Sequence, residues 1–389
     1  MLAILCGPAS RLYGEAQAEL PYALAPTGEA LAITVDGGNT ALDVKPDEFT
    51  DTEWDYANFG AFGSGCFVPT YSEHGAFVIA GSGGHEVPDH IGATLVDFST
   101  GKWARLDNSN GVDYKQASPP VFQDTDTNGD PWYEITGSTV PAPPHPYGCM
   151  VFSPAGTKGS VIHITKTATT AQSVISDRCH AMDLATREWT RASTNGSGRA
   201  NFEADAVWDE ARGLWWFTQQ SQHSYQSVSY LDNADATFKT LGSFDFPSGD
   251  IEGPARCVLH SGLLVRPCGN TRGLWLFDPD DANDGWIELT VTGTMPNQAN
   301  RWAQYSDGKY YGIPSSGGNT LTRITPPVDP KSGTWACDTV EIGGNTLPTG
   351  QRGSYTTKEH YGRLINVPSI DRLVWIPGGS EANYTIKPA

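Results

Sequence analysis

An aromatic residue recurs along this chain at a nearly constant interval. Trp189, Phe238, Trp286 and Trp335 are separated by steps of 49, 48 and 49 residues. A period of this size indicates one supersecondary unit that is repeated, because a unit of this length does not bury its apolar face alone. We therefore predict an all-β repeat protein whose repeats close into a ring.

Two further tryptophans extend the series upstream. Trp54 and Trp103 are 49 residues apart, and 86 residues separate Trp103 from Trp189. Most of the aromatics close the same phrase, in which a short apolar run is followed by Asp, a polar turn and the aromatic residue. Before Trp103 it reads Val-Asp-Phe-Ser-Thr-Gly-Lys, and before Trp189 it reads Met-Asp-Leu-Ala-Thr-Arg-Glu. We expect these aromatics at equivalent places near the outer strands of the repeats.

Each repeat is interpreted as four short strands. In the unit of Trp103, apolar runs over residues 65–69, 76–80 and 93–97 are separated by turn-forming residues, and the outermost strand starts at Trp103. Comparable units cover about residues 145–194, 199–242, 250–291 and 297–342. Four antiparallel strands in a unit of this size are typical of a β-propeller blade.

The two ends of the chain are expected to meet in one blade. The segment from Tyr361 onward supplies inner strands but has no Trp-turn of its own. Its missing outer strand is expected within the first 55 residues, for example at 30–35 or 41–44, which would protect the sheet edges. Residues 1–389 then form a single domain. Six blades can be located, and we favour a seven-bladed ring, with the seventh blade in residues 1–55 and six blades as the alternative.

The 86-residue step marks an insertion between two blades. Residues 107–144 are polar and rich in proline, and they show no clean alternation. We expect a long inter-blade loop here, and loops of this length inside a compact domain usually have a function or are disordered.

Part of this insertion resembles the start of a calcium-binding loop. Oxygen-bearing side chains stand at alternate positions, followed by a glycine for the turn. The candidate ligands are Asp124, Asp126, Asn128 and Asp130. An EF-hand would place a glutamate at the twelfth position, where Ile135 stands, and Glu134 is one residue early. Calcium binding and a solvated Asx-rich turn are both open interpretations.

Composition excludes some classes of partner. The 389 residues carry a formal net charge of −19, whereas a nucleic-acid-binding protein needs a basic face. An anionic substrate is still compatible, because a local arginine cluster can dominate the field in a pocket. The chain shows no signal peptide and no membrane span. We expect a soluble monomer that contacts neither nucleic acid nor membrane, and action outside a cell or on a virion is compatible with it.

Seven cysteines are an odd number for a disulfide-stapled protein. Cys66, Cys149 and Cys257 fall at equivalent repeat positions. We interpret them as small apolar side chains on crowded inner strands.

Residues 82–98, which contain the run Ser-Gly-Gly-His up to His85, resemble a signature of bacterial Kelch-like, galactose-oxidase-type propeller proteins. The ending from Tyr361 to Trp375 is similar to theirs, and the resemblance spans roughly residues 60–387. It implies a Kelch-like propeller, in a group that includes oxidases and polysaccharide lyases. The Tyr–Cys pair with two His that a copper oxidase needs is not found, so neither copper nor a nucleotide cofactor is expected. The His, Tyr and Arg spacings of ulvan-lyase-type propellers are not reproduced, so the chemistry must be argued from the site.

A ring of polar residues precedes the innermost strands. When these strands are aligned on the cysteine positions, the residues two and four places upstream keep to one side, because side chains alternate in a strand. The members of this ring that we select as site residues are His145, Tyr147, Asn201, Glu203, Arg301, Tyr361 and Arg363. They either form a site in a central funnel or bridge neighbouring blades through hydrogen bonds.

This ring suits cleavage of a polysaccharide. In β-elimination on a uronate polymer, Arg301 or Arg363 would neutralise the carboxylate, and Tyr147 or His145 would serve as base and acid. Hydrolysis would need a second carboxylate beside Glu203. Asp205, Asp250 and Glu252 are the available carboxylates, and none forms a compelling pair.

Other residues are candidates for substrate binding. His85, in the glycine-rich loop, and Asn201, Trp302 and Tyr361 are the substrate-binding candidates, although a loop histidine can equally be a hydrogen-bonding surface residue. We expect a polysaccharide lyase. The alternatives are a glycoside hydrolase of the same polysaccharide and a non-catalytic, adhesin-like propeller that binds glycan or protein.

Overall fold

The fold is given by a computed structural model. It describes residues 21–33, 40–45, 47, 49–51, 54, 65–80, 93–106, 124–125, 131–135, 138–141, 150–152, 161–164, 179–191, 205–220, 225–232, 237–245, 257–268, 273–295, 302–314, 316–348, 363–378 and 381–389.

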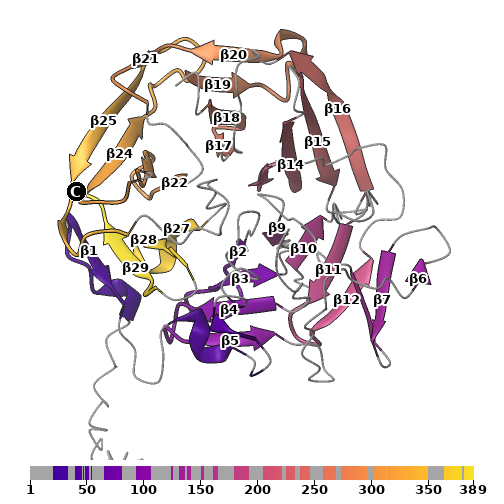
Figure 1. The fold of residues 1–389 in the computed structure, drawn as a ribbon. Helices are drawn as coiled ribbons and strands as arrows, with labels where there is room; N and C mark the ends of the chain where they lie inside the picture. The colour runs from indigo at the N-terminus through magenta and orange to yellow at the C-terminus, as the bar shows by residue number, and fades with distance from the viewer. Residues whose placement is uncertain are drawn as a thin grey trace, which may run out of the picture.

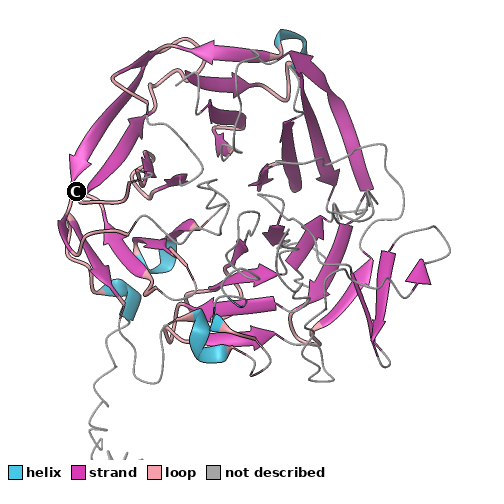
Figure 2. Ribbon diagram, in the orientation of Figure 1, coloured by secondary structure: helices cyan, strands magenta, loops and turns pink. Residues whose placement is uncertain are grey.

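Small antiparallel sheets stand around a central axis, in the arrangement of a β-propeller (Figure 1). Four of these sheets have four strands and two have five. In the four-stranded sheets the chain runs from the axis outward and consecutive strands pair, whereas the five-stranded sheets also take up outer strands from other parts of the chain. Strands dominate the described part of the chain, and the helices that it contains are short 3-10 segments before or between strands (Figure 2). The predicted all-β propeller arrangement is confirmed.

The first three sheets follow one another along the chain. The first holds β2 (Gly65–Val68), β3 (Ala76–Ala80), β4 (Ala93–Asp97) and β5 (Trp103–Leu106). The second holds β9 (Met150–Phe152), β10 (Val161–Ile164), β11 (Cys179–Asp183) and β12 (Glu188–Arg191). The third holds β13 (Asp205–Asp209), β14 (Leu214–Gln220), β15 (Tyr225–Asp232) and β16 (Thr237–Asp245).

The other three sheets complete the ring. The fourth holds β17 (Val258–His260), β18 (Leu263–Cys268), β19 (Gly273–Phe277) and β20 (Trp286–Leu289). The fifth holds β22 (Trp302–Gln304), β23 (Tyr310–Gly312), β24 (Thr320–Thr325), β25 (Trp335–Glu341) and β21 (Val291–Thr292). The last holds β27 (Leu364–Val367), β28 (Arg372–Trp375), β29 (Tyr384–Lys387), β1 (Glu29–Ala32) and β26 (Gly343–Gly344).

The periodic aromatics lie in the outermost hairpin strands, as predicted. Trp103, Trp286 and Trp335 are the first residues of β5, β20 and β25. Trp189 and Phe238 are the second residues of β12 and β16. The repeat period therefore reports the position of the last turn in each blade.

The aspartate of the repeated phrase has a local cause. Asp97 ends β4, and its Oδ1 accepts a hydrogen bond from the backbone N–H of Ser99 at 2.9 Å. Asp183 ends β11, and its Oδ1 accepts from the N–H groups of Ala185 and Thr186 at 2.9 and 3.1 Å. An aspartate that binds the backbone ahead of it holds a tight turn, which is why the residue recurs at this place.

The two ends of the chain share one sheet. β1 pairs antiparallel with β29, with Ala30 opposite Ile386, which confirms the predicted closure by residues 30–35. The other candidate, residues 41–44, is instead the 3-10 helix η2 (Ala41–Val44). β26 adds to β1 in parallel and covers its outer edge.

The prediction of seven blades is wrong for the described part of the chain. The ring contains the four four-stranded and two five-stranded sheets above, and the first 55 residues contribute β1 to the last of them. Trp54, which shares the 49-residue spacing, does not start a blade strand. It is fully buried, its indole N–H donates to the carbonyl of Ala41 at 2.8 Å, and its ring packs against Phe49.

The insertion contains strands. β6 (Asp124–Thr125), β7 (Pro131–Ile135) and β8 (Ser138–Pro141) form a three-stranded antiparallel sheet beside the ring. The expectation of a long loop over 107–144 is corrected to this extent. Strands of two to five residues are too short to show a clear alternation in the sequence.

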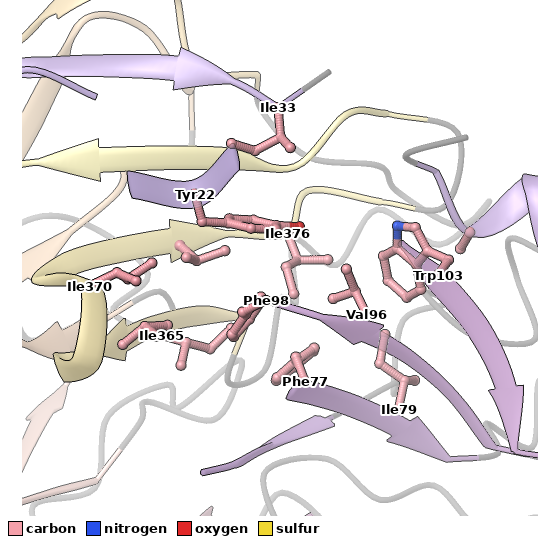
Figure 3. Packing of buried hydrophobic residues seen from close by; sticks show 13 residues of the cluster. Tyr22, Ile33, Phe77, Ile79, Val96, Phe98, Trp103, Ile365, Ile370 and Ile376 are labelled. Atoms are coloured by element: carbon pink, nitrogen blue, oxygen red, sulfur yellow. The ribbon is translucent and has the colours of Figure 1, made fainter. Parts of the chain in front are cut away.

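Apolar clusters fill the contacts between neighbouring sheets. Figure 3 shows one of them, in which Phe77 and Val96 of the first sheet meet Ile365 and Ile376 of the last sheet's chain segment, and Tyr22 covers them. Burying a side chain of this size contributes roughly 1.5–3 kcal/mol each. The ring is thus held by packing between blades.

Two of the cysteines expected as fillers are buried. Cys66 in β2 is 8% exposed and Cys257 beside β17 is 1% exposed. Burial raises the pKa of the Cys66 thiol above its usual range, which keeps the group neutral. Both are free thiols in the structure, as the interpretation requires.

Candidate functional site

The innermost strands converge on a central cavity of about 410 Å³. Residues of β2, β9, β13, β17, β22 and β27 line it, so every sheet of the ring contributes. Ligand pockets typically enclose about 300 to 1,000 Å³. The cavity on the axis is therefore large enough to be the candidate site.

The described wall of this cavity is uncharged. None of the described residues that line it is Asp, Glu, Lys, Arg or His. Gln304 in β22 and Asn366 in β27 supply the amide groups, and the remaining side chains are apolar, aromatic or thiol. A wall of this kind holds a ligand by contact and hydrogen bonding, whereas a buried ionic group would need a counter-charge.

Two tryptophans form the largest aromatic surface on the wall. Trp208 in β13 pairs directly with Trp215 in β14, and their ring centroids are 5.2 Å apart at an interplanar angle of 49°. The indole N–H of Trp208 donates to Oε2 of Glu210 at 2.7 Å, which fixes its orientation. Reasoning from the sequence did not select this pair. The sequence signal that could have found it is the position of the two tryptophans on either side of the turn from Asp209 to Gly213, where they pair across the hairpin.

Arg363 is the one predicted catalytic residue within the described part of the chain. It precedes β27 directly and is 1% exposed. Its Nη1 donates to the carbonyl of Pro377 at 3.3 Å, and its own carbonyl accepts the N–H of Ile376. The guanidinium therefore lies within the fold of the last sheet, where it supports the segment after β28.

The other predicted catalytic residues lie outside the described residues. They are His145, Tyr147, Glu203 and Arg301. In the sequence they stand shortly before β9, β13 and β22, three of the strands that line the cavity. The assignment of catalytic roles to them stays a prediction.

Among the substrate-binding candidates, Trp302 is the one that the structure describes. Trp302 starts β22, is 3% exposed and packs in an apolar cluster with Leu263 and Val265 of the neighbouring sheet. A Cβ atom added at Gly312 would meet its ring at 3.0 Å, so the ring is tightly enclosed. Trp302 therefore belongs to the core here, and the expectation that it stacks on a sugar does not fit this position. His85, Asn201 and Tyr361 lie outside the described residues.

The first of the candidate calcium ligands lies in the inserted sheet. Asp124 is the first residue of β6, and Asp126, Asn128 and Asp130 lie outside the described residues, between β6 and β7 in the sequence. Where the chain is described, no group of three or more His, Cys, Asp and Glu side chains could hold a metal ion. Calcium binding stays a prediction.

Comparison with known proteins gives weak structural similarity. No family model matches the chain, and no curated protein matches it. The periplasmic gluconolactonase of Pseudomonas aeruginosa is similar with a TM-score of 0.38 and 14% identity, over 74% of this chain and 88% of that one. TolB from Acinetobacter baumannii gives 0.33 and 16%, over 71% and 65%. A chain of a nidogen/laminin complex gives 0.37 and 9%, over 71% and 84%.

Similarities at this level carry no conclusion about function, and the propeller arrangement rests on the sheets described above. Where the chain is described, it contains no helix long and apolar enough to cross a membrane.

Proposed function

We propose that this protein is a Kelch-like propeller that depolymerises an anionic polysaccharide by β-elimination at its central axis. The observation that carries the proposal is the convergence of all the innermost strands on one cavity of about 410 Å³. His145, Tyr147, Glu203 and Arg301 precede three of those strands in the sequence, so the candidate chemistry is attached to the elements that build the cavity.

The Kelch-like type is proposed from the sequence. The glycine-rich run before His85 leads into β4, the third strand of its blade, as in the proteins that it resembles. The C-terminal run that resembles theirs spans β27 and β28.

The reaction assigns one task to each residue type. A base, Tyr147 or His145, removes the proton on C5 of the uronate, and the electron pair forms the C4–C5 double bond. The C4–O bond breaks, and the other residue of the pair protonates the departing oxygen. Arg301 neutralises the carboxylate, which stabilises the charge that develops on proton removal. A guanidinium suits this task because it stays protonated at neutral pH.

Absorbance of the unsaturated uronate product tests this proposal. The protein is incubated with a panel of uronate polysaccharides, and absorbance and new reducing ends are recorded together. A lyase raises both signals, whereas a hydrolase raises the reducing ends alone. Tyr147→Phe should abolish turnover, and Arg301→Ala should remove about 3 kcal/mol of transition-state stabilisation, as expected for loss of an oxyanion donor. Full activity in Tyr147→Phe would sink this site assignment.

A second candidate is a propeller that binds a glycan or a protein without turnover. It is favoured by the uncharged wall of the described cavity and by the engagement of Arg363 with the Pro377 carbonyl. If the protein binds a glycan or a protein but produces neither unsaturated uronate nor new reducing ends, this candidate is the correct one. A glycoside hydrolase around Glu203 is the third reading, and the same two signals separate it from the lyase.

We further propose that calcium binds at the hairpin between β6 and β7. Chelation should then lower the thermal midpoint, and added calcium should restore it. The oxygens of Asp124, Asp126 and Asn128 should surround the ion at about 2.3–2.6 Å. Equal midpoints in chelator and in calcium would eliminate the site.

A further inference from the structure

Accessible side chains of two kinds line the central cavity from different sheets. Trp208 in β13 and Leu259 in β17 line it from the third and fourth sheets, which follow one another in the ring. Gln304 in β22 and Asn366 in β27 line it from the fifth and last sheets. Figure 1 shows β22 and β27 across the axis from β14, the hairpin partner of β13. A group bound in the cavity therefore meets apolar and amide side chains from different directions.

These four side chains keep accessible surface. Each of them is partly exposed, whereas Met150, Cys257 and Ile365 on the same wall are buried. The partly exposed side chains are the ones that a ligand can contact. Because the Oδ1 atom of Asn366 is itself enclosed, Gln304 is the amide that we assign to a ligand.

The amide of Gln304 can make further hydrogen bonds. Within the described chain its Nε2 donates to the carbonyl of Gly308 at 3.5 Å. A side-chain amide has two N–H donors and a carbonyl oxygen that accepts. The Oε1 atom and the second N–H therefore suit a partner that both donates and accepts, and another amide is such a partner.

Trp208 and Leu259 offer an apolar contact. The indole N–H of Trp208 donates to Oε2 of Glu210 at 2.7 Å, so the polar edge of this ring is already paired. The carbon surface of the ring and the side chain of Leu259 are partly exposed on the cavity wall. A small apolar group that lies against them is removed from water, which favours its binding.

We propose that the central cavity binds the acetamido group of an N-acetylated sugar. Its methyl group contacts Trp208 and Leu259, and its amide pairs with the amide of Gln304. An acetamido group joins a methyl to an amide, and these are the two chemistries that the accessible wall accommodates. The inference rests on the proposed function in one respect, because the sugar is taken to belong to the polysaccharide substrate. The substrate is then a polymer in which uronates neighbour N-acetylated sugars.

Calorimetric titration of the full chain with matched oligosaccharides tests the inference. Chitohexaose and cellohexaose share one glucan backbone, and only chitohexaose carries acetamido groups. A hyaluronan hexasaccharide, in which glucuronate alternates with N-acetylglucosamine, is compared with tetragalacturonate. The variants are Gln304→Met, which keeps the length of the side chain, and Leu259→Asn. Asn283→Leu is the control, because Asn283 is an exposed amide in η3 (Ala282–Asp284) and does not line the cavity.

Chitohexaose should bind about tenfold more tightly than cellohexaose, and the hyaluronan hexasaccharide more tightly than tetragalacturonate. Gln304→Met should weaken chitohexaose binding about tenfold and leave cellohexaose binding unchanged, because it removes hydrogen bonds that only the acetamido group makes. Leu259→Asn should weaken chitohexaose binding less. Asn283→Leu should bind like the unmodified chain. If Gln304→Met does not fold, the two ligand pairs and Leu259→Asn decide.

Equal binding of chitohexaose and cellohexaose overturns the inference, and so does a preference for chitohexaose that Gln304→Met keeps. These outcomes are distinguishable from failure of the lyase proposal. A preference that depends on Gln304, without unsaturated product from any uronate polymer, leaves the cavity assignment standing and removes the lyase. Unsaturated product without the preference removes the cavity assignment alone.

Discussion

Two contacts between neighbouring blades are built differently. The closure seam is the contact between the first sheet and the last, together with residues 21–23, which cover it and lie against β28 and β29. The repeat seam is the contact between the fourth sheet and the fifth. Both bury an apolar cluster of branched aliphatic and aromatic residues, in which isoleucine dominates at the closure seam and leucine at the repeat seam. They differ in the polar groups that accompany the cluster.

The closure seam adds buried hydrogen bonds between distant parts of the chain. Asn383 Nδ2 donates to the hydroxyl of Tyr22 at 2.9 Å, and Thr385 Oγ1 donates to the carbonyl of Tyr22. Arg372 Nη2 donates to the carbonyl of Ala23 at 2.9 Å. These bonds join Tyr22 and Ala23 to β28 and to residues 383–385 at β29. They fix how the N-terminal segment lies against the last sheet, from which it is far away in the sequence.

The repeat seam relies on aromatic packing. His260 lies edge-on to Tyr310 and Trp335, with ring centroids 5.8 and 5.4 Å apart. The buried Nδ1 of His260 and the hydroxyl of Tyr310 have no partner. Consecutive blades are tethered by the chain itself, because β20 of the fourth sheet is followed directly by β21, which pairs with β25 of the fifth. An ion pair between Lys331 and Asp278 also joins the two sheets, but it is partly exposed, so the buried part of this seam consists mainly of packed side chains.

The largest effect is expected in the repeat seam. Trp335 is fully buried in its cluster, so Trp335→Ala should lower the free energy of unfolding by about 3–5 kcal/mol. The measurement is the urea midpoint followed by tryptophan fluorescence and by circular dichroism. Val328→Ala is the control, since Val328 is fully exposed in the preceding turn. A loss no larger than that of the control would mean that packing does not hold this seam.

A smaller effect is expected in the closure seam. Tyr22→Phe keeps the ring but removes the acceptor of the Asn383 bond, and Asn383 is fully buried. Leaving a buried donor unpaired costs about 1–3 kcal/mol. The thermal midpoint of the variant should fall accordingly. Tyr310→Phe in the repeat seam is the counterpart, because its hydroxyl has no partner to lose and its removal should not destabilise. Equal losses in the two variants would break the contrast between the seams.

The sequence predicted this architecture at the level of the repeat. The Asp-turn-aromatic phrase located the outermost hairpins, and the absence of such a phrase after Tyr361 predicted closure by residues 30–35, which β1 confirms. Spacing did not distinguish Trp54 from the blade tryptophans, because a 49-residue step says nothing about what surrounds the ring. Its complete burial is a tertiary feature.

The candidate site was harder to predict. Trp302 has the same sequence character as a sugar-binding tryptophan, and its burial depends on the neighbouring sheet, which only the fold reveals. Trp208 and Trp215 read as ordinary strand residues, and their meeting on the cavity wall depends on the register of β13 with β14. The alternation of side chains along a strand predicts which face of the sheet a residue lies on, but not which residues of a neighbouring strand or sheet it contacts.

The smallest effect is a dependence of the repeat seam on pH. Burial lowers the pKa of His260 below its ordinary value, because the aromatic surroundings offer no partner for the charged ring. The unfolded chain therefore binds a proton here at a higher pH than the folded chain does, and stability rises with pH in that window. Stability should be full above about pH 6.5, the ordinary value of histidine, and should decline as the pH falls through the lowered pKa. The urea midpoint of His260→Phe, compared with the unmodified chain between pH 5 and pH 8, measures this term. The difference between the two chains should grow in favour of the variant as the pH falls. A constant difference would show that His260 is solvated in the folded ring and that the repeat seam is less closed than the packing of Trp335 implies.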